Sequence, residues 1–167
     1  MKNLFYSTDH FDGIKIDVLS SSKGIRNISI NLKTKPYELL NATRVPKDDS
    51  NLCGVFLQLK EYFNKERKTF ELQLEIIGTE FQKKVWKELL KIPYGETISY
   101  KELSIRIGNL KSIRAVGKAN GSNPLPIVIP CHRVIGADGK LVGYGGGLDV
   151  KEKLLKLEGS MRADLFS

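Results

Sequence analysis

The sequence predicts an α/β (α+β) protein built from two domains. Residues 1–77 are expected to form a small antiparallel sheet with one main helix, and residues 78–167 a mainly helical domain that contains a helix-turn-helix. Three observations support this prediction. Apolar and polar residues alternate near the N-terminus, helical spacing and capping signals dominate from residue 78 onward, and 167 residues suffice for two small cores.

The first 33 residues read as strands. Residues 13–19 and 24–32 alternate apolar and polar side chains on either side of the turn-like segment 20–23, which predicts an antiparallel hairpin. Residues 34–50 are polar and interrupted by two prolines, so a loop with room for a short helix is expected there.

A helix is predicted over residues 51–64, because apolar side chains recur there at helical spacing. Cys53 falls within this helix and is expected to be a packing residue. Residues 70–77 are expected to be a strand or an extended linker that leaves the first domain, to which we assign a scaffold role. The side chains at helical spacing are Leu52, Val55, Phe56, Leu59 and Phe63.

Capping signals predict three further helices after Gly78. Thr79 precedes Gln82 by three residues, which is the spacing of a capping box, and this helix should end near Pro93. Ser99 precedes Glu102 in the same way and opens a second helix.

The second and third of these helices form the predicted helix-turn-helix. Gly108 stops the second helix, Ser112 is expected to cap the third, and Gly121 ends it. Two short helices joined by a short glycine-containing turn are typical of this motif, although the pattern alone is a weak signal.

The third helix is slim and basic. Ala115, Gly117 and Ala119 leave little bulk on its surface, whereas Arg114 and Lys118 carry charge. A glycine inside a helix costs about 1 kcal/mol relative to alanine, so Gly117 needs a reason. Close approach of another backbone is one reason, and both a protein helix and DNA remain open as the approaching partner.

The most chemically informative stretch is the pair Cys131-His132, which lies on a stiff segment punctuated by Pro124, Pro126 and Pro130. A thiol needs a base or a positive environment to act as a nucleophile. The alternative is that Cys131 is a small buried apolar residue. On an extended segment neighbouring side chains point to opposite faces, so activation by His132 requires a bridging water or a local bend.

A final helix is predicted to start at Asp149, with Glu152 in the capping-box position, and to end at Gly159. Glu158 lies in its last turn, where a carboxylate is disfavoured by the helix dipole. It is either an exposed acid or a partner that orients His132.

The net charge is +8, and its distribution is uneven. Residues 1–77 carry 12 Lys/Arg against 10 Asp/Glu, a net of +2, whereas residues 78–167 carry 15 against 9, a net of +6. A basic second half indicates a polyanionic partner, with nucleic acid favoured over a membrane, or else a solvated cationic surface.

Two cysteines and two histidines make neither a disulfide framework nor a structural zinc site that spares Cys131, so we expect neither. The chain start lacks the apolar core of a signal peptide, and no apolar run reaches the length of a membrane span. An intracellular protein with a free thiol is therefore expected.

Six motifs together resemble the O6-alkylguanine-DNA alkyltransferase (methylated-DNA–protein-cysteine methyltransferase) family, in order and in spacing, over about residues 78–160. The run around Cys131 and the run that starts at Arg114 are the most specific. The motifs are Ile98-Ser99-Tyr100, Arg114-Ala115-Val116-Gly117, Asn123-Pro124, Pro130-Cys131-His132-Arg133-Val134, Gly143-Tyr144, and Lys151-Glu152 with Leu154-Leu155 and Glu158-Gly159.

The resemblance implies a ribonuclease H-like N-terminal domain, a winged helix-turn-helix-like C-terminal domain, and DNA repair by one irreversible transfer of an alkyl group from O6-alkylguanine, and also O4-alkylthymine, to Cys131. It implies no cofactor, no metal, double-stranded DNA containing O6-alkylguanine as the partner, and a cytoplasmic monomer.

The resemblance also implies a role for each matching residue. Cys131 would be the acceptor, His132 a water-mediated base, Glu158 the residue that orients it, Asn123 the residue that holds the turn, and Tyr100 a hydrogen-bond donor to guanine. Arg114 would fill the gap left by the flipped nucleotide. The DNA-binding set would be Ser99, Tyr100, Arg114, Ala115, Gly117, Lys118 and Ser122, and the substrate pocket Pro126, Val134, Tyr144 and Gly145.

Other functions remain open at this stage. A lesion-binding protein without alkyl transfer is the main alternative, and the presence of Cys131 counts against it. A cysteine hydrolase would show a burst followed by turnover. A sequence-specific regulator is disfavoured because the slim helix offers few side chains for reading base edges. Among departures from the family, Gly145 offers only backbone where many relatives carry a side chain.

Overall fold

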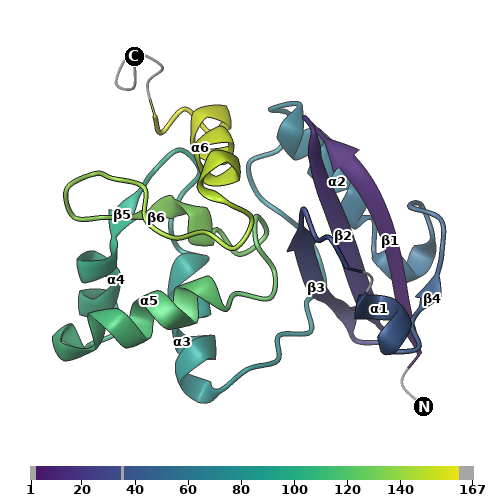
Figure 1. The fold of residues 1–167 in the computed structure, drawn as a ribbon, viewed down its shortest axis with the longest axis horizontal. Helices are drawn as coiled ribbons and strands as arrows, with labels where there is room; N and C mark the ends of the chain where they lie inside the picture. The colour runs from purple at the N-terminus through teal and green to yellow at the C-terminus, as the bar shows by residue number, and fades with distance from the viewer. Residues whose placement is uncertain (1–2, 35, 162–167) are drawn as a thin grey trace. The chain divides into compact units, whose positions relative to one another are not determined.

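A computed structural model of the chain describes residues 3–34 and 36–161 (Figure 1). The chain divides into two compact units, Met1–Ile77 and Gly78–Ser167. The α/β fold class is confirmed, with a sheet and helices in the first unit and mainly helices in the second. Within the described residues, no helix is long and apolar enough to cross a membrane.

The first unit is built on a four-stranded sheet in the order β3-β2-β1-β4. Strands β2 (Ile14–Ser21) and β3 (Gly24–Ile30) form the antiparallel hairpin that the alternating pattern predicts, and β1 (Leu4–Phe11) pairs antiparallel with β2 to complete a meander. The short strand β4 (Thr43–Arg44) pairs parallel with β1. The sheet is therefore mixed, and the prediction of a purely antiparallel sheet was wrong at this edge, where a two-residue strand carries no periodic signal.

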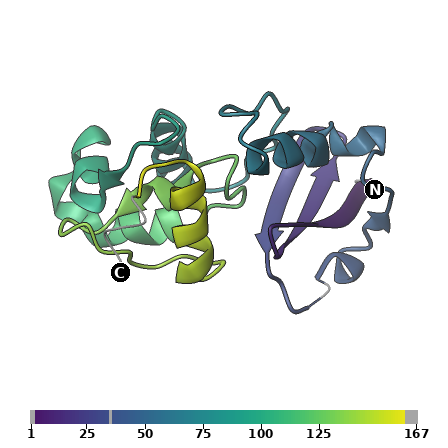
Figure 2. The same cartoon turned by 90° about the horizontal axis from the view of Figure 1, so that it is seen from above.

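Two helices accompany the sheet. Helix α2 (Val55–Phe63) covers the face that carries Ile16 and Val18, which are both fully buried. The short helix α1 (Pro36–Leu39) lies on the opposite side of the sheet, as Figure 2 shows. The strands thus place apolar side chains toward α2 and polar ones toward α1, in accordance with the two-residue repeat of a strand.

The predicted helix 51–64 is interrupted at Cys53. A 3₁₀ helix spans Ser50–Leu52, and Cys53 and Gly54 then adopt left-handed conformations, with φ of 54° and 71°. The left-handed pair breaks the helical hydrogen-bond ladder before α2 begins. Cys53 is exposed, so its prediction as a packing residue was wrong.

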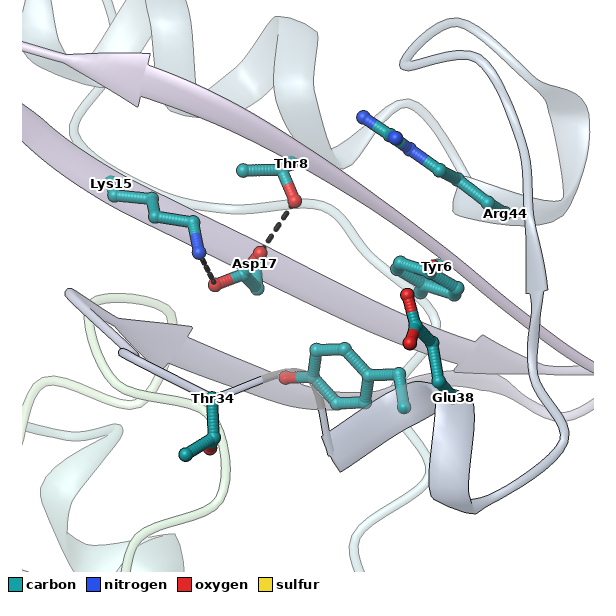
Figure 3. A pocket seen from close by; sticks show the side chains of 8 residues that line it. Tyr6, Thr8, Lys15, Asp17, Thr34, Glu38 and Arg44 are labelled. Carbon is teal, nitrogen blue, oxygen red and sulfur yellow. Dashed lines mark hydrogen bonds and ion pairs between the residues drawn. The ribbon is translucent and has the colours of Figure 1, made fainter.

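A cavity of about 190 Å³ lies on the α1 side of the sheet (Figure 3). Its central carboxylate, Asp17, accepts a hydrogen bond from Thr8 and lies 3.3 Å from the Lys15 Nζ. These two contacts account for a buried acid on a central strand. The cavity is lined by Tyr6, Thr8, Lys15, Asp17, Thr34, Tyr37, Glu38 and Arg44.

The second unit packs three helices into a small core. Helix α3 (Glu80–Leu89) buries Trp86, whose Nε1 donates to the Ala119 carbonyl of helix α5 (Ile113–Gly121) at 2.8 Å. Helix α4 (Tyr100–Arg106) precedes α5 and is joined to it through the 3₁₀ helix Leu110–Ser112. The predicted pair of short helices with a short turn is therefore present (Figure 1).

The remaining elements of this unit carry the Cys131 region. Strand β5 (Ile98–Ser99) pairs parallel with β6 (Val134–Ile135), and helix α6 (Leu148–Leu157) follows. Neither two-residue strand was predicted, because each is too short for a periodic pattern.

The predicted caps have mixed outcomes. The Thr79 capping box is confirmed in both directions, and Ser99 caps α4 by accepting from the Glu102 amide. Ser112 instead donates to the Asn109 carbonyl, so its prediction as a capping side chain was wrong. Helix α6 is preceded by Gly147 at φ 99°, which places Asp149 in the first turn and not at the cap.

Candidate active site

The nucleophile candidate sits on a single turn of 3₁₀ helix, Cys131–Arg133. The Arg133 amide donates to the Pro130 carbonyl at 3.1 Å, and the Val134 amide donates to the Cys131 carbonyl. The segment is therefore a turn and not extended, so the local bend, one of the two conditions considered for the Cys131-His132 pair, is present. Cys131 is only 5% exposed and His132 is fully buried.

A strained loop leads into this turn. Asn123 Nδ2 donates to the Ile129 carbonyl at 2.7 Å, and Asn123 Oδ1 accepts from the Leu125 amide at 2.9 Å. Between them Ile127 has a φ of 74°, a conformation that β-branched residues rarely adopt, and it is 1% exposed. Asn123 thus ties both ends of a loop that local preferences alone would not form.

A buried ion cluster lies behind the turn. Glu158 Oε1 is 2.7 Å from His132 Nε2, and Glu158 Oε2 is 2.8 Å from Arg133 Nε. Arg133 also donates to the Ile92 carbonyl at 2.6 Å and lies over the Tyr94 ring at 5.8 Å. Of the two alternatives for Glu158, the exposed acid is excluded.

The protonation states of Glu158 and His132 depend on burial and on the charged groups around them. Burial alone would raise the pKa of Glu158, but the hydrogen bonds from His132 and Arg133 outweigh it and lower the pKa to about 2. The pKa of His132 is lowered overall, because the effect of burial exceeds the opposite effect of the Glu158 carboxylate. An ionised carboxylate only accepts, so Nε2 of a neutral His132 carries the proton and Nδ1 keeps its lone pair. That Nδ1 has no hydrogen-bond partner among the described residues.

The thiol itself is protonated at rest. Burial raises the pKa of Cys131, while Asn123 and the charge of Lys151 lower it. A buried thiol with a raised pKa requires a base at the moment of reaction.

Lys151 is a site residue that the sequence motifs did not single out as functional. Its side chain is fully buried on α6, and its Nζ donates to the carbonyls of Val134, Val142 and Gly143 at 2.6, 3.1 and 3.4 Å. Burial lowers its pKa to about 8. Lys151 follows Val150 and lies three and four residues before Leu154 and Leu155, which are also buried. Its place on this helical stripe was a signal that it points inward.

Tyr100 connects the same loop to the helix-turn-helix. Its hydroxyl donates to the Val142 carbonyl at 3.0 Å, and the Lys151 Nζ lies 5.8 Å from its ring centroid. Burial and the charge of Cys131 raise the pKa of Tyr100. The first residue of α4 and a lysine of α6 therefore hold one carbonyl of the loop that follows Cys131.

The four predicted pocket residues differ in exposure. Val134 is fully buried, Pro126 and Tyr144 are half-buried, and Gly145 is exposed. The Tyr144 hydroxyl is buried without a hydrogen-bond partner among the described residues, and burial raises its pKa well above the usual value.

Three of the predicted DNA-binding residues lie on the outer, exposed side of α5. Arg114, Ala115 and Lys118 are exposed, whereas Val116 on the same helix is buried. A side chain at Gly117 would meet only the Tyr100 ring, at 3.8 Å, which is ordinary contact. Protein packing therefore does not require this glycine. Ser122 is exposed and Ser99 half-buried.

Two family models match the chain. The model described as "6-O-methylguanine DNA methyltransferase, DNA binding domain" matches residues 80–160, and "6-O-methylguanine DNA methyltransferase, ribonuclease-like domain" matches residues 6–76.

Individual relatives agree with these matches. The chain is 61% identical over 103 residues to a methylated-DNA–protein-cysteine methyltransferase of Methanosarcina acetivorans, covering 62% of this chain and 66% of that protein. It is 54% identical over 113 residues to the protein of the same name from Mycobacterium bovis, covering 68% of each. The crystal structure of Mycobacterium tuberculosis OGT in complex with DNA is similar at a TM-score of 0.85, with 42% identity over 96% of this chain and 97% of that one.

Proposed function

The chain belongs to the 6-O-methylguanine DNA methyltransferase family, and we propose on this basis that it repairs DNA by moving an alkyl group from O6 of guanine to Cys131. The observation that carries the proposal is the buried His132–Glu158 contact of 2.7 Å directly beside Cys131. Residues 78–167 would bind DNA and accept the alkyl group, and residues 1–77 would act as a scaffold.

The nucleophile is activated by His132. Because Glu158 holds Nε2–H, the Nδ1 lone pair is the available base, and a water molecule carries the proton from the Cys131 thiol to it. Glu158 then stabilises the imidazolium that forms. Arg133 keeps Glu158 ionised and fixed, so the base has one orientation.

Transfer then proceeds by displacement at the alkyl carbon. The Cys131 thiolate forms a carbon–sulfur bond, the carbon–O6 bond breaks, and its electron pair passes to the guanine. Tyr100 donates its hydroxyl proton to the guanine ring, so the base leaves as a neutral species, and the tyrosinate regains a proton from solvent. The thioether product is stable, so each molecule reacts once. O4-alkylthymine is a second proposed substrate.

Access to the lesion requires base flipping, because the duplex hides the O6 substituent. The outer side of α5 can approach a minor groove closely, since Ala115 and Gly117 are small. The exposed Arg114 would fill the space left in the stack. Pro126, Val134, Tyr144 and the backbone at Gly145 would line the pocket for the flipped base.

Intact-protein mass after reaction with a duplex containing one O6-methylguanine tests this function. We expect a shift of a single methyl group, located on Cys131 by peptide mapping and absent from Cys131→Ala. Arg114→Ala should slow transfer from the duplex but leave transfer from the free base O6-benzylguanine unchanged, because the free base needs no flipping. Tight binding of the lesion without any mass shift would instead indicate a lesion-binding protein.

A further inference from the structure

Asn120 connects the proposed recognition helix with the nucleophile turn. It lies in the last turn of α5, is 4% exposed, and its Nδ2 donates to the Cys131 carbonyl at 3.4 Å. The side chain therefore points away from the outer surface of α5 and toward the reacting residue. None of the roles assigned above uses it.

The same side chain lies near Tyr100. The Tyr100 ring runs along α5, because a Cβ built at Gly117 would lie 3.8 Å from its Cδ1. Asn120 follows Gly117 by three residues, so the two are neighbours on the helix surface, with Gly117 half-buried at the edge of the outer side and Asn120 buried inward of it. Burial and the charge of Cys131 raise the pKa of Tyr100, and hydrogen bonding by Asn120 lowers it. One carboxamide thus bonds to the turn of the proposed nucleophile and influences the pKa of the proposed proton donor.

The carboxamide is also incompletely satisfied. Asn120 Oδ1 is buried and has no hydrogen-bond partner among the described residues. A buried unpaired acceptor costs about 1–3 kcal/mol, and such groups in a native fold call for a specific reason. An apolar residue of similar size would avoid this cost if packing of α5 were the only requirement.

We propose that Asn120 is a positioning residue for the alkyl transfer, which holds the Tyr100 hydroxyl beside the Cys131 turn and donates a hydrogen bond to its oxygen as the proton leaves. The inference rests on the proposed function.

The Tyr100 hydroxyl must change partners for this to occur. At rest it donates to the Val142 carbonyl at 3.0 Å. When it turns to the guanine ring, its oxygen acquires negative charge as the proton moves. The Asn120 amide donates to that oxygen, and Lys151 adds a positive charge nearby. No atom is gained or lost by Asn120 in this step.

A double-mutant cycle tests whether Asn120 acts through Tyr100. The rate of alkyl transfer from the free base O6-benzylguanine is measured for wild type, Asn120→Leu, Tyr100→Phe and the double variant. We expect Asn120→Leu to slow transfer on the order of tenfold to a hundredfold, the range for a hydrogen bond to a charged group. In the Tyr100→Phe background the same change should have little further effect.

A spectroscopic readout separates positioning from packing. The tyrosinate absorbance of Tyr100, obtained by difference from Tyr100→Phe, should titrate at higher pH in Asn120→Leu than in wild type. Asn120→Gln should recover part of the rate, because it keeps the donor. Asn64→Leu, a matched substitution at an exposed position at the end of α2, should leave the rate unchanged.

Three results would overturn the inference. Asn120→Leu could react at the wild-type rate, or it could slow the reaction equally in both backgrounds, as a general packing defect would. A folded wild type that transfers nothing, from either duplex or free base, would overturn the proposed function and this inference with it.

Discussion

Glu158 Oε1 lies 2.7 Å from His132 Nε2 in a fully buried contact, and this leaves Nδ1 as the nitrogen that can accept a proton. The pair is joined across 26 positions in the sequence, from the 3₁₀ turn to the end of α6. This contact determines which ring nitrogen of His132 is available to accept the proton of the Cys131 thiol.

Loss of this base should therefore slow the chemical step. We expect His132→Phe to reduce the rate of alkyl transfer by about 10²–10⁴-fold, the usual contribution of a general base. Single-turnover kinetics by intact mass would measure it. Binding of the duplex should be retained, because His132 is buried away from the outer side of α5. An unchanged transfer rate would rule out His132 as the base.

Stability should fall in acid because of the same carboxylate. The pKa of Glu158 in the folded protein is about 2, below its ordinary value of 4.5. Its contribution to the free energy of unfolding is therefore fully present above pH 4.5 and is lost as the pH falls toward 2. The lowered pKa of His132 acts in the same direction, since a buried neutral ring resists protonation. Urea unfolding at several pH values would show this decline.

The variant Glu158→Gln is the control for the pH dependence of unfolding. It should be less stable at neutral pH by about 3–5 kcal/mol, because Arg133 is left buried without its counter-ion. Its unfolding free energy should also depend less on pH between 4.5 and 2. An equally steep acid dependence in the variant would assign the effect to other groups.

The two cysteines should differ in reactivity. Cys53 is exposed, whereas Cys131 is buried and its pKa is raised by that burial. Iodoacetamide at neutral pH should therefore modify Cys53 first, with Cys131 following at least about tenfold more slowly. Peptide mapping over time would quantify both sites. Equal rates in guanidinium chloride would show that the difference depends on the fold.

Gly117→Ala should separate stability from DNA binding. The added methyl group meets only the Tyr100 ring at 3.8 Å, so the helix should gain up to about 1 kcal/mol. Calorimetry should show a higher melting temperature. If α5 enters the minor groove, the same methyl group should weaken duplex binding while transfer from the free base is kept. A variant that loses both stability and binding would contradict this reading of Gly117.

Local signals in the sequence predicted much of the fold. The alternation in β2 and β3 and the Thr79–Gln82 box each depend on neighbours within a few residues, and both are present. Strands β4, β5 and β6 were not predicted, because two residues cannot show a period and their pairing partners lie elsewhere in the chain. Asp149 was misplaced because Gly147 adopts a positive φ that opens the helix earlier.

Part of the candidate site was predictable from residue chemistry before any motif was considered. Cys131 and His132 were selected as a pair on a proline-rich segment, and Glu158 from its unfavourable place at the end of a helix. Asn120 and Lys151 were not selected, because their contacts are with backbone carbonyls near Cys131 that no spacing rule describes. Both are polar residues on otherwise buried helical faces, which is the signal that could have drawn attention to them.

Ile127 bears on the order in which the second unit folds. A buried β-branched residue at φ 74° disfavours its own loop by about 1–3 kcal/mol, so we expect residues 123–130 to form after the core around them. The loop becomes favourable only when Asn123 and the surrounding core are in place. We therefore expect the thiol to reach its reactive setting late in folding. Alkyl transfer would then report on completely folded molecules, and a partly folded chain would leave the lesion untouched.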